Sequence, residues 1–119
     1  MKPHREFFEI DEEAGWVPVG EDIAAKVLVT SLDESAKHGS LNRLVRRAPH
    51  ARIDSVRVHD FHEEVLVVRG SLEVASQEAP HAWETFPALS FACRPPGARH
   101  GPFRAGPEGC LLFETQYYK

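Results

Sequence analysis

Histidines and carboxylates gather in two short segments of this chain, and these side chains are common ligands of divalent transition metals. The first segment, residues 57–64, reads RVHDFHEE, and the second, residues 94–102, reads RPPGARHGP. Because the two segments lie far apart in the sequence, only a folded sheet can bring them together. We therefore expect the functional site where they meet.

Strand alternation predicts which of these side chains converge. Residues two apart in a strand share a face, so Arg57 and His59 lie together, and Glu63 leads one face of the next apolar strand. If both faces point inward, Arg57, His59 and Glu63 gather at one mouth of a barrel. The rigid turn before His100 would direct its imidazole to the same mouth. Two histidines and one carboxylate can bind one face of a metal and leave positions open for water, substrate or oxygen.

Two charged neighbours of these residues leave alternatives open. Glu64 competes with Glu63, because a slip of one residue in register would reverse which carboxylate faces inward. Arg57 would be costly inside an apolar barrel unless it met an anion. In one alternative it pairs with Glu63 or Glu64 and holds the mouth of the barrel together. In the other it binds the carboxylate or enolate of a substrate through two hydrogen bonds. Arg57 and Glu64 are therefore the candidate catalytic residues.

The elements that would position these side chains are strands. Nine prolines and eight glycines separate short segments rich in Val, Leu and Phe, which predicts an all-β protein. Residues 69–71 indicate a tight turn at Gly70, and residues 77–84 an exposed loop or hairpin. The sequence contains no internal repeat and no linker between domains. The expected strands are 25–30, 41–46, 53–59, 64–69, 71–75, 90–94 and 110–115.

Composition excludes several classes of function. The chain has 119 residues, which suits one domain, and a formal charge of -4 with scattered basic residues, which argues against a nucleic-acid surface. No apolar stretch reaches the ~20 residues of a membrane span. The first residues lack the apolar core of a signal peptide, so we expect a cytoplasmic protein. Cys93 and Cys110 are expected to be reduced and packed rather than bridged.

At the two metal-ligand segments the chain resembles the cupin superfamily. That family has a first motif that ends H-x3-E-x6-G and a second motif centred on P-x-G-x2-H. His59, Glu63 and Gly70 reproduce the first spacing, and residues 95–100 reproduce the second. The amino-acid sequence of residues 63–70, 95–103 and 109–113 is similar to that of the anti-sigma-factor (ChrR-like) branch, which includes small single-domain dioxygenase-like proteins. The likeness covers residues 41–117.

The resemblance implies a cupin-type double-stranded β-helix, or jelly-roll barrel, with His59, Glu63 and His100 as metal ligands. Spacing to Gly70 favours Glu63 over Glu64. Arg57 replaces the first histidine of the family motif, so no fourth ligand is carried over, and His62 would fill the gap if residues 60–61 bend the chain. The family's remaining motif positions are also changed, at Ala51, Leu89 and Arg104.

From these features we expect one cupin domain over residues 1–119, with residues 1–24 packed on the barrel or a neighbouring subunit and residues 25–119 forming it. The leading expectation is a metal-dependent oxygenase, or related lyase or isomerase, acting on a small oxygenated or dicarbonyl-like molecule. The metal would be Fe, Zn, Ni or Mn. A ligand- or metal-sensing module without catalysis is the alternative, and a degenerate structural cupin is a third. The resemblance also implies a homodimer.

Overall fold

The structure is a computed structural model that describes residues 1–76 and 82–118. All of its regular elements are strands, so the all-β prediction is confirmed. No helix in these residues is long and apolar enough to cross a membrane. The strands are β1 (Val17–Gly20), β2 (Ile23–Thr30), β3 (Ser40–Arg47), β4 (Arg52–Ile53), β5 (His62–Ala75), β6 (Trp83–Pro87), β7 (Phe91–Arg94) and β8 (Phe103–Tyr117).

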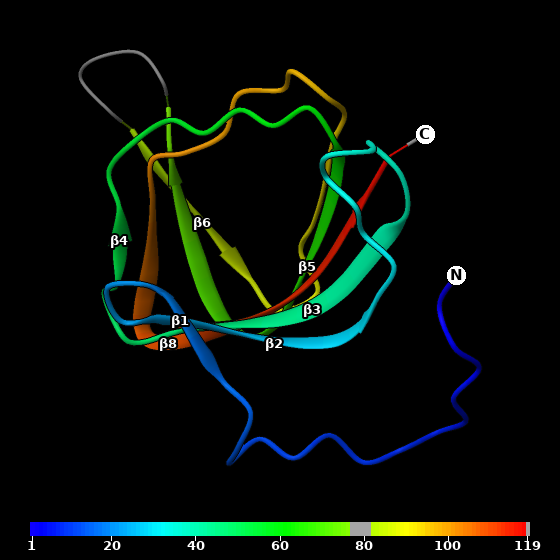
Figure 1. Ribbon diagram of the computed structural model, residues 1–119. Helices are drawn as coiled ribbons and strands as arrows, with labels where there is room; N and C mark the ends of the chain where they lie inside the picture. Colours follow the sequence, from blue (N-terminus) through cyan, green and yellow to red (C-terminus); the bar gives the residue numbers. More distant parts are fainter. Residues whose placement is uncertain (77–81, 119) are drawn as a thin grey trace.

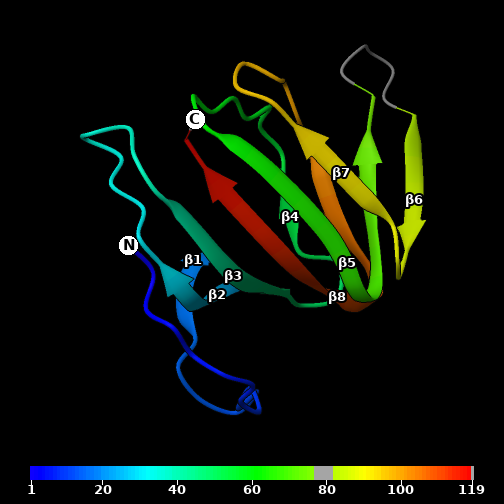
Figure 2. The ribbon, with the colours of Figure 1, turned by 90° about the vertical axis from the view of Figure 1, so that its right-hand side faces the viewer.

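The strands pair antiparallel in the order β1-β2-β3-β8-β5-β6, while β4 pairs with β8 and β7 with β5. Figure 1 shows them curling around one interior, and Figure 2 shows β3, β8 and β5 side by side as the continuous wall of the barrel. The long strands β5 and β8 pair with each other along most of their length and bend together. The two loops that carry the candidate ligands, green and orange in Figure 1, run side by side at one end.

The predicted turn at residues 69–71 is wrong, because β5 continues through it. Gly70 has a φ of 76° and lies at a break in register between β5 and β8, so the glycine makes a bulge rather than a reversal. A Cβ on Gly70 would collide with the backbone carbonyl of Gly109 on β8. The positive φ needed there is the same signal that a hairpin would give, which explains the error.

Other predictions differ from the structure or fall partly outside the described residues. The strand expected over residues 53–59 is reduced to β4 and one bridge at Arg57, and strands β1 and β6 lie outside the predicted set. The loop expected at 77–84 falls partly on residues 77–81, which lie outside the described residues. Both cysteines are free as expected, but Cys93 is exposed rather than packed, and only Cys110 is buried.

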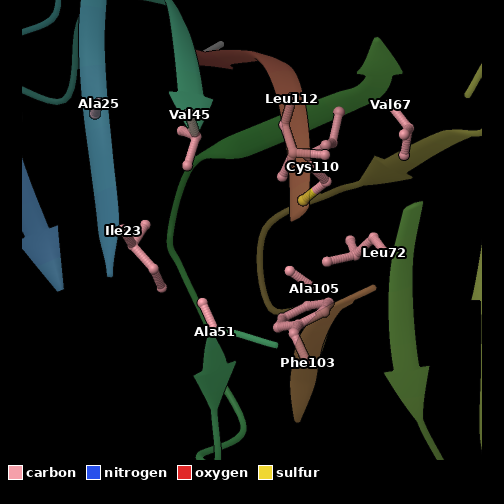
Figure 3. Packing of buried hydrophobic residues seen from close by; sticks show 11 residues of the cluster. Ile23, Ala25, Val45, Ala51, Val67, Leu72, Phe103, Ala105, Cys110 and Leu112 are labelled. Carbon is pink, nitrogen blue, oxygen red and sulfur yellow. The ribbon is translucent and has the colours of Figure 1, made fainter. Parts of the chain in front are cut away.

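The core lies inside the bent sheet. Leu112 on β8 is 1% exposed, and Val45, Val67 and Leu72 approach it from the neighbouring strands (Figure 3). The two-residue alternation of strands places these positions inward, and the register shifts around Gly70 reset it between Val67 and Leu72 on β5. On the same inward faces, however, polar and charged residues continue the apolar rows, as Glu114 and Gln116 do after Leu112. The interior therefore holds polar and charged side chains beside its apolar core.

The first 16 residues form no strand but are tied to the barrel. Lys2 donates a hydrogen bond to the Asn42 side chain at 2.6 Å, Trp16 lies against the Arg46 guanidinium, and Arg69 pairs with Glu12. Several large apolar side chains stay in solvent in this segment and on β1, namely Met1, Phe7, Phe8, Val17 and Val19.

Candidate metal centre

Three of the predicted ligands meet at the end of the interior where the loops before β5 and after β7 lie. The ligand atoms of His59, Glu63 and His100 all lie within 4.8 Å of one another. His59 lies in the loop before β5, Glu63 is the second residue of β5, and His100 lies in the loop after β7. Glu63 and His100 are buried, and His59 is half-buried. Three donors at this spacing suit a single divalent cation.

Backbone hydrogen bonds hold the two ligand-bearing loops together. The N–H of Arg57 donates to the carbonyl of His100 at 2.7 Å, and the N–H of His100 donates back to Arg57 at 3.0 Å. The N–H of Gly97 donates to the carbonyl of His59 at 2.9 Å. Gly97 has a φ of 85°, which favours glycine in the turn. The relative position of the two histidines is thus set by main-chain bonds.

Glu63 is held by two partners that sequence reasoning missed. Arg94 on β7 pairs with Oε1 at 3.1 Å, and the Gln116 amide on β8 donates to Oε2 at 2.9 Å. Both residues lie directly opposite Glu63 in the strand register. Residues directly opposite each other on paired strands face the same side of the sheet. Arg94 and Gln116 could therefore have been identified only if the pairing of β5 with β7 and β8 had been known.

The surroundings of His100 fit a metal ligand. Its side chain is 9% exposed and lies 3.9 Å from Glu63 Oε1, and its Nδ1 is buried without a hydrogen-bond partner among the described residues. Burial and the neighbouring Arg94 charge hold the pKa of His100 below its ordinary value. The imidazole is therefore neutral near pH 7, which is the form that binds a metal. The His59 ring lies 5.0 Å away and stacks on Phe61 at 4.5 Å.

Two other predicted site residues, His62 and Glu64, lie apart from these three. The His62 ring stacks on Tyr117 at 4.8 Å, and the Tyr117 hydroxyl donates to Glu64 at 2.7 Å. Alternation in β5 explains this, since burial is high at Glu63 and lower at its two neighbours. The Arg57 side chain is exposed and borders the cavity beside the histidines. Its predicted partners Glu63 and Glu64 bond instead to Arg94, Gln116 and Tyr117.

A cavity of about 470 Å³ opens beside the three candidate ligands. Val45, Val65, Leu72, Leu112 and Phe103 form its apolar walls. Its inner polar groups include Arg43, which pairs with Glu114 at 2.9 Å, and Arg47, neither of which was predicted from the sequence. Burial raises the pKa of Glu114, although Arg43 opposes the shift. The sequence signal for an inward-facing arginine was its position two residues after a core residue on the same strand, as Arg47 follows Val45.

The sequence profile of the ChrR cupin-like domain matches residues 4–118, nearly the whole chain. The chain belongs to the ChrR cupin-like family. The predicted cupin resemblance and the double-stranded β-helix fold are therefore confirmed. No protein with curated annotation matches the sequence.

Solved cupin structures share this fold at low sequence identity. An RmlC-like cupin from Shewanella frigidimarina is 18% identical with a TM-score of 0.69, over 97% of this chain and 93% of that one. An acetylacetone dioxygenase from Acinetobacter johnsonii is 19% identical with a TM-score of 0.66, over 95% and 74%. Rhodobacter sphaeroides SigE in complex with the anti-sigma ChrR matches at 15% identity and a TM-score of 0.62, over 87% and 49%. The fold thus occurs in both an enzyme and a regulator.

Proposed function

We propose that this cupin is a metal-dependent enzyme, of the oxygenase type or a related lyase or isomerase, that acts on a small oxygenated or dicarbonyl-like molecule. The observation that carries the proposal is the group of His59, Glu63 and His100, whose ligand atoms lie within 4.8 Å at the wall of a cavity of about 470 Å³. A cavity of this size suits a small molecule. The similarity of fold to an acetylacetone dioxygenase is in keeping with this class of substrate.

In this proposal His59, Glu63 and His100 hold the metal, which would be iron, zinc, nickel or manganese. When bound, such a metal supplies Lewis-acid polarisation of a substrate oxygen or redox chemistry with dioxygen. Gln116 orients the Glu63 carboxylate, and Arg94 pairs with the same carboxylate and competes with the metal for it. Arg57 at the rim would meet an anionic group of the substrate. His62 and Glu64 face Tyr117 and take no part in the proposed site.

Two measurements on the purified protein test the proposal. Elemental analysis should find close to one transition metal per chain, and acetylacetone should be consumed together with dioxygen in an oxygen electrode. A degenerate cupin would contain no metal after equilibration with any of the four ions. Metal without turnover of a panel of small dicarbonyl compounds would instead favour a sensor.

The second candidate function is a ligand- or metal-sensing module without catalysis. Its support is that both oxygens of Glu63 are already bonded, one to Arg94 and the other to Gln116. A metal that bound Glu63 would have to change these contacts. A change between two arrangements is what a sensor requires. The shared fold with an anti-sigma ChrR is in keeping with this role. Dioxygen uptake with a product trace separates the two functions.

We also propose a homodimer in the cytoplasm. Phe7, which is fully exposed, and the exposed valines of the edge strand β1 are apolar surfaces that a second copy would cover. Two free cysteines suit a reducing compartment.

Replacing Phe7 and Phe8 by serine should weaken this dimer. We expect the wild type to run at twice the mass of one chain in light scattering at micromolar concentration. The double variant should dissociate at least ~10-fold more readily, because it exposes less apolar surface to the partner. Phe91→Ser, which changes an exposed phenylalanine on β7, is the matched control. A single-chain mass for the wild type at every concentration would contradict the proposal.

A further inference from the structure

Among the described residues that line the cavity, Arg47 is a buried guanidinium without a hydrogen-bond partner. Arg47, the last residue of β3, is only 8% exposed, yet its Nε and Nη1 atoms have no hydrogen-bond partner among the described residues. An unpaired buried charge is strongly unfavourable, and burial accordingly lowers the pKa of this guanidinium. Such a group is kept in a fold when something else supplies its counter-charge.

The head of Arg47 lies on the cavity side of the sheet. Its Cζ lies 5.4 Å from the centre of the Phe103 ring, and the Cζ of Arg94 lies 5.3 Å from the same ring. Arg46, the neighbouring residue, points to the opposite face and packs on Trp16. Phe103 belongs to the cavity wall and to the core cluster in Figure 3, so Arg47 reaches the cavity next to an apolar surface.

The carboxylates of the cavity are already committed to other arginines. Glu114 pairs with Arg43 at 2.9 Å, and Glu63 pairs with Arg94 at 3.1 Å. At the rim Asp54 pairs with Arg52, while Arg57 and Glu21 are exposed, where water screens their charges. Among the described residues that line the interior, three guanidinium groups therefore face two carboxylates. The inner cavity has an excess of one positive charge at Arg47.

We propose that this cavity binds a small organic carboxylate whose anionic group pairs with Arg47. A guanidinium matches a carboxylate in shape and can donate two parallel hydrogen bonds to it. Nε and Nη1 of Arg47 have no hydrogen-bond partner among the described residues, so such a carboxylate would supply the counter-charge that this group lacks. The body of the molecule would lie against Val45, Leu72 and Phe103. This inference deepens the proposed function. It rests on that proposal in one respect, which is that the other end of the bound molecule would react near His59 and His100.

A matched pair of compounds tests the inference by NMR titration of the full chain in EDTA. Acetoacetate and acetylacetone share a β-dicarbonyl skeleton and a similar size, but only acetoacetate carries a carboxylate. We expect acetoacetate to bind the wild type at least ~10-fold more tightly. Arg47→Met should remove that preference and leave acetylacetone binding unchanged. Arg46→Met, the matched control on the other face, should keep it, and Arg47→Lys should keep part of it.

Three outcomes would overturn the inference. Equal affinity of the wild type for the two compounds would show that the charge is not recognised. Equally tight binding of inorganic phosphate would mark a general anion site rather than a carboxylate site. A ligand-free Arg47→Met protein that melts several degrees below the wild type, or does not fold, would show that the guanidinium already has a structural partner. Since metal is excluded from the titration, failure of the metal proposal would leave these results unchanged.

Discussion

The His100→Ala variant is expected to lose nearly all of the metal that the wild type retains. His100 contributes a buried neutral imidazole to a group of three donors among the described residues, so its removal leaves two. Loss of a residue that merely supports a ligand weakens metal binding by about 10–100-fold, and loss of the ligand itself should cost more. We expect a decrease of more than ~100-fold in affinity, measured by elemental analysis after equilibration with a buffered metal.

His62→Ala is the matched control for this prediction. His62 is also a histidine near the start of β5, but its ring stacks on Tyr117 and lies outside the group of donors. Metal content should therefore stay at the wild-type level. Equal occupancy in wild type and His100→Ala would remove His100 from the site, and loss in His62→Ala alone would place the metal on the opposite face of β5.

Glu63→Ala is expected to lose both metal and stability. The change leaves Arg94, whose side chain is 17% exposed, without its carboxylate partner. It also removes the acceptor of the Gln116 amide. Breaking a buried ion pair from one side costs about 3–5 kcal/mol, because the remaining charge is left uncompensated. The measurement is urea unfolding in EDTA, so that loss of metal does not contribute to the difference.

Glu64→Ala provides the comparison. It removes one hydrogen bond, from the Tyr117 hydroxyl, on the outer face of β5. The free energy of unfolding should change by no more than about 1 kcal/mol, and metal content should not change. If the two variants were equally stable, or if Glu64→Ala were the one that lost metal, the inward carboxylate would have been assigned to the wrong residue.

The three candidate ligands could be found from the sequence because their positions depend on local rules. Alternation left Glu63 and Glu64 as alternatives, and the cupin motif spacing to Gly70 favoured Glu63. The structure brings Glu63 next to His59 and His100. The all-β class followed equally from short apolar segments between prolines and glycines. These signals need no knowledge of which strands are neighbours.

The polar surroundings of the site could not be found in this way. Arg94, Gln116 and Arg47 face the interior because of how β7, β8 and β3 lie beside other strands, and that arrangement is a property of the whole barrel. Charged residues in a strand are ordinarily expected on its solvated face. The single strand β5 was divided in two for a related reason, since a glycine with positive φ serves a bulge as well as a turn.

The main-chain bridge between Arg57 and His100 makes residue 57 an unusually free position. Both hydrogen bonds of the bridge come from backbone atoms, so any residue other than proline can stand there and still present the imidazole at the same place. A related chain can therefore carry a different side chain at residue 57 and admit different molecules to the cavity, while the backbone around the site stays the same. Selectivity for incoming compounds can diverge here faster than the architecture that supports it.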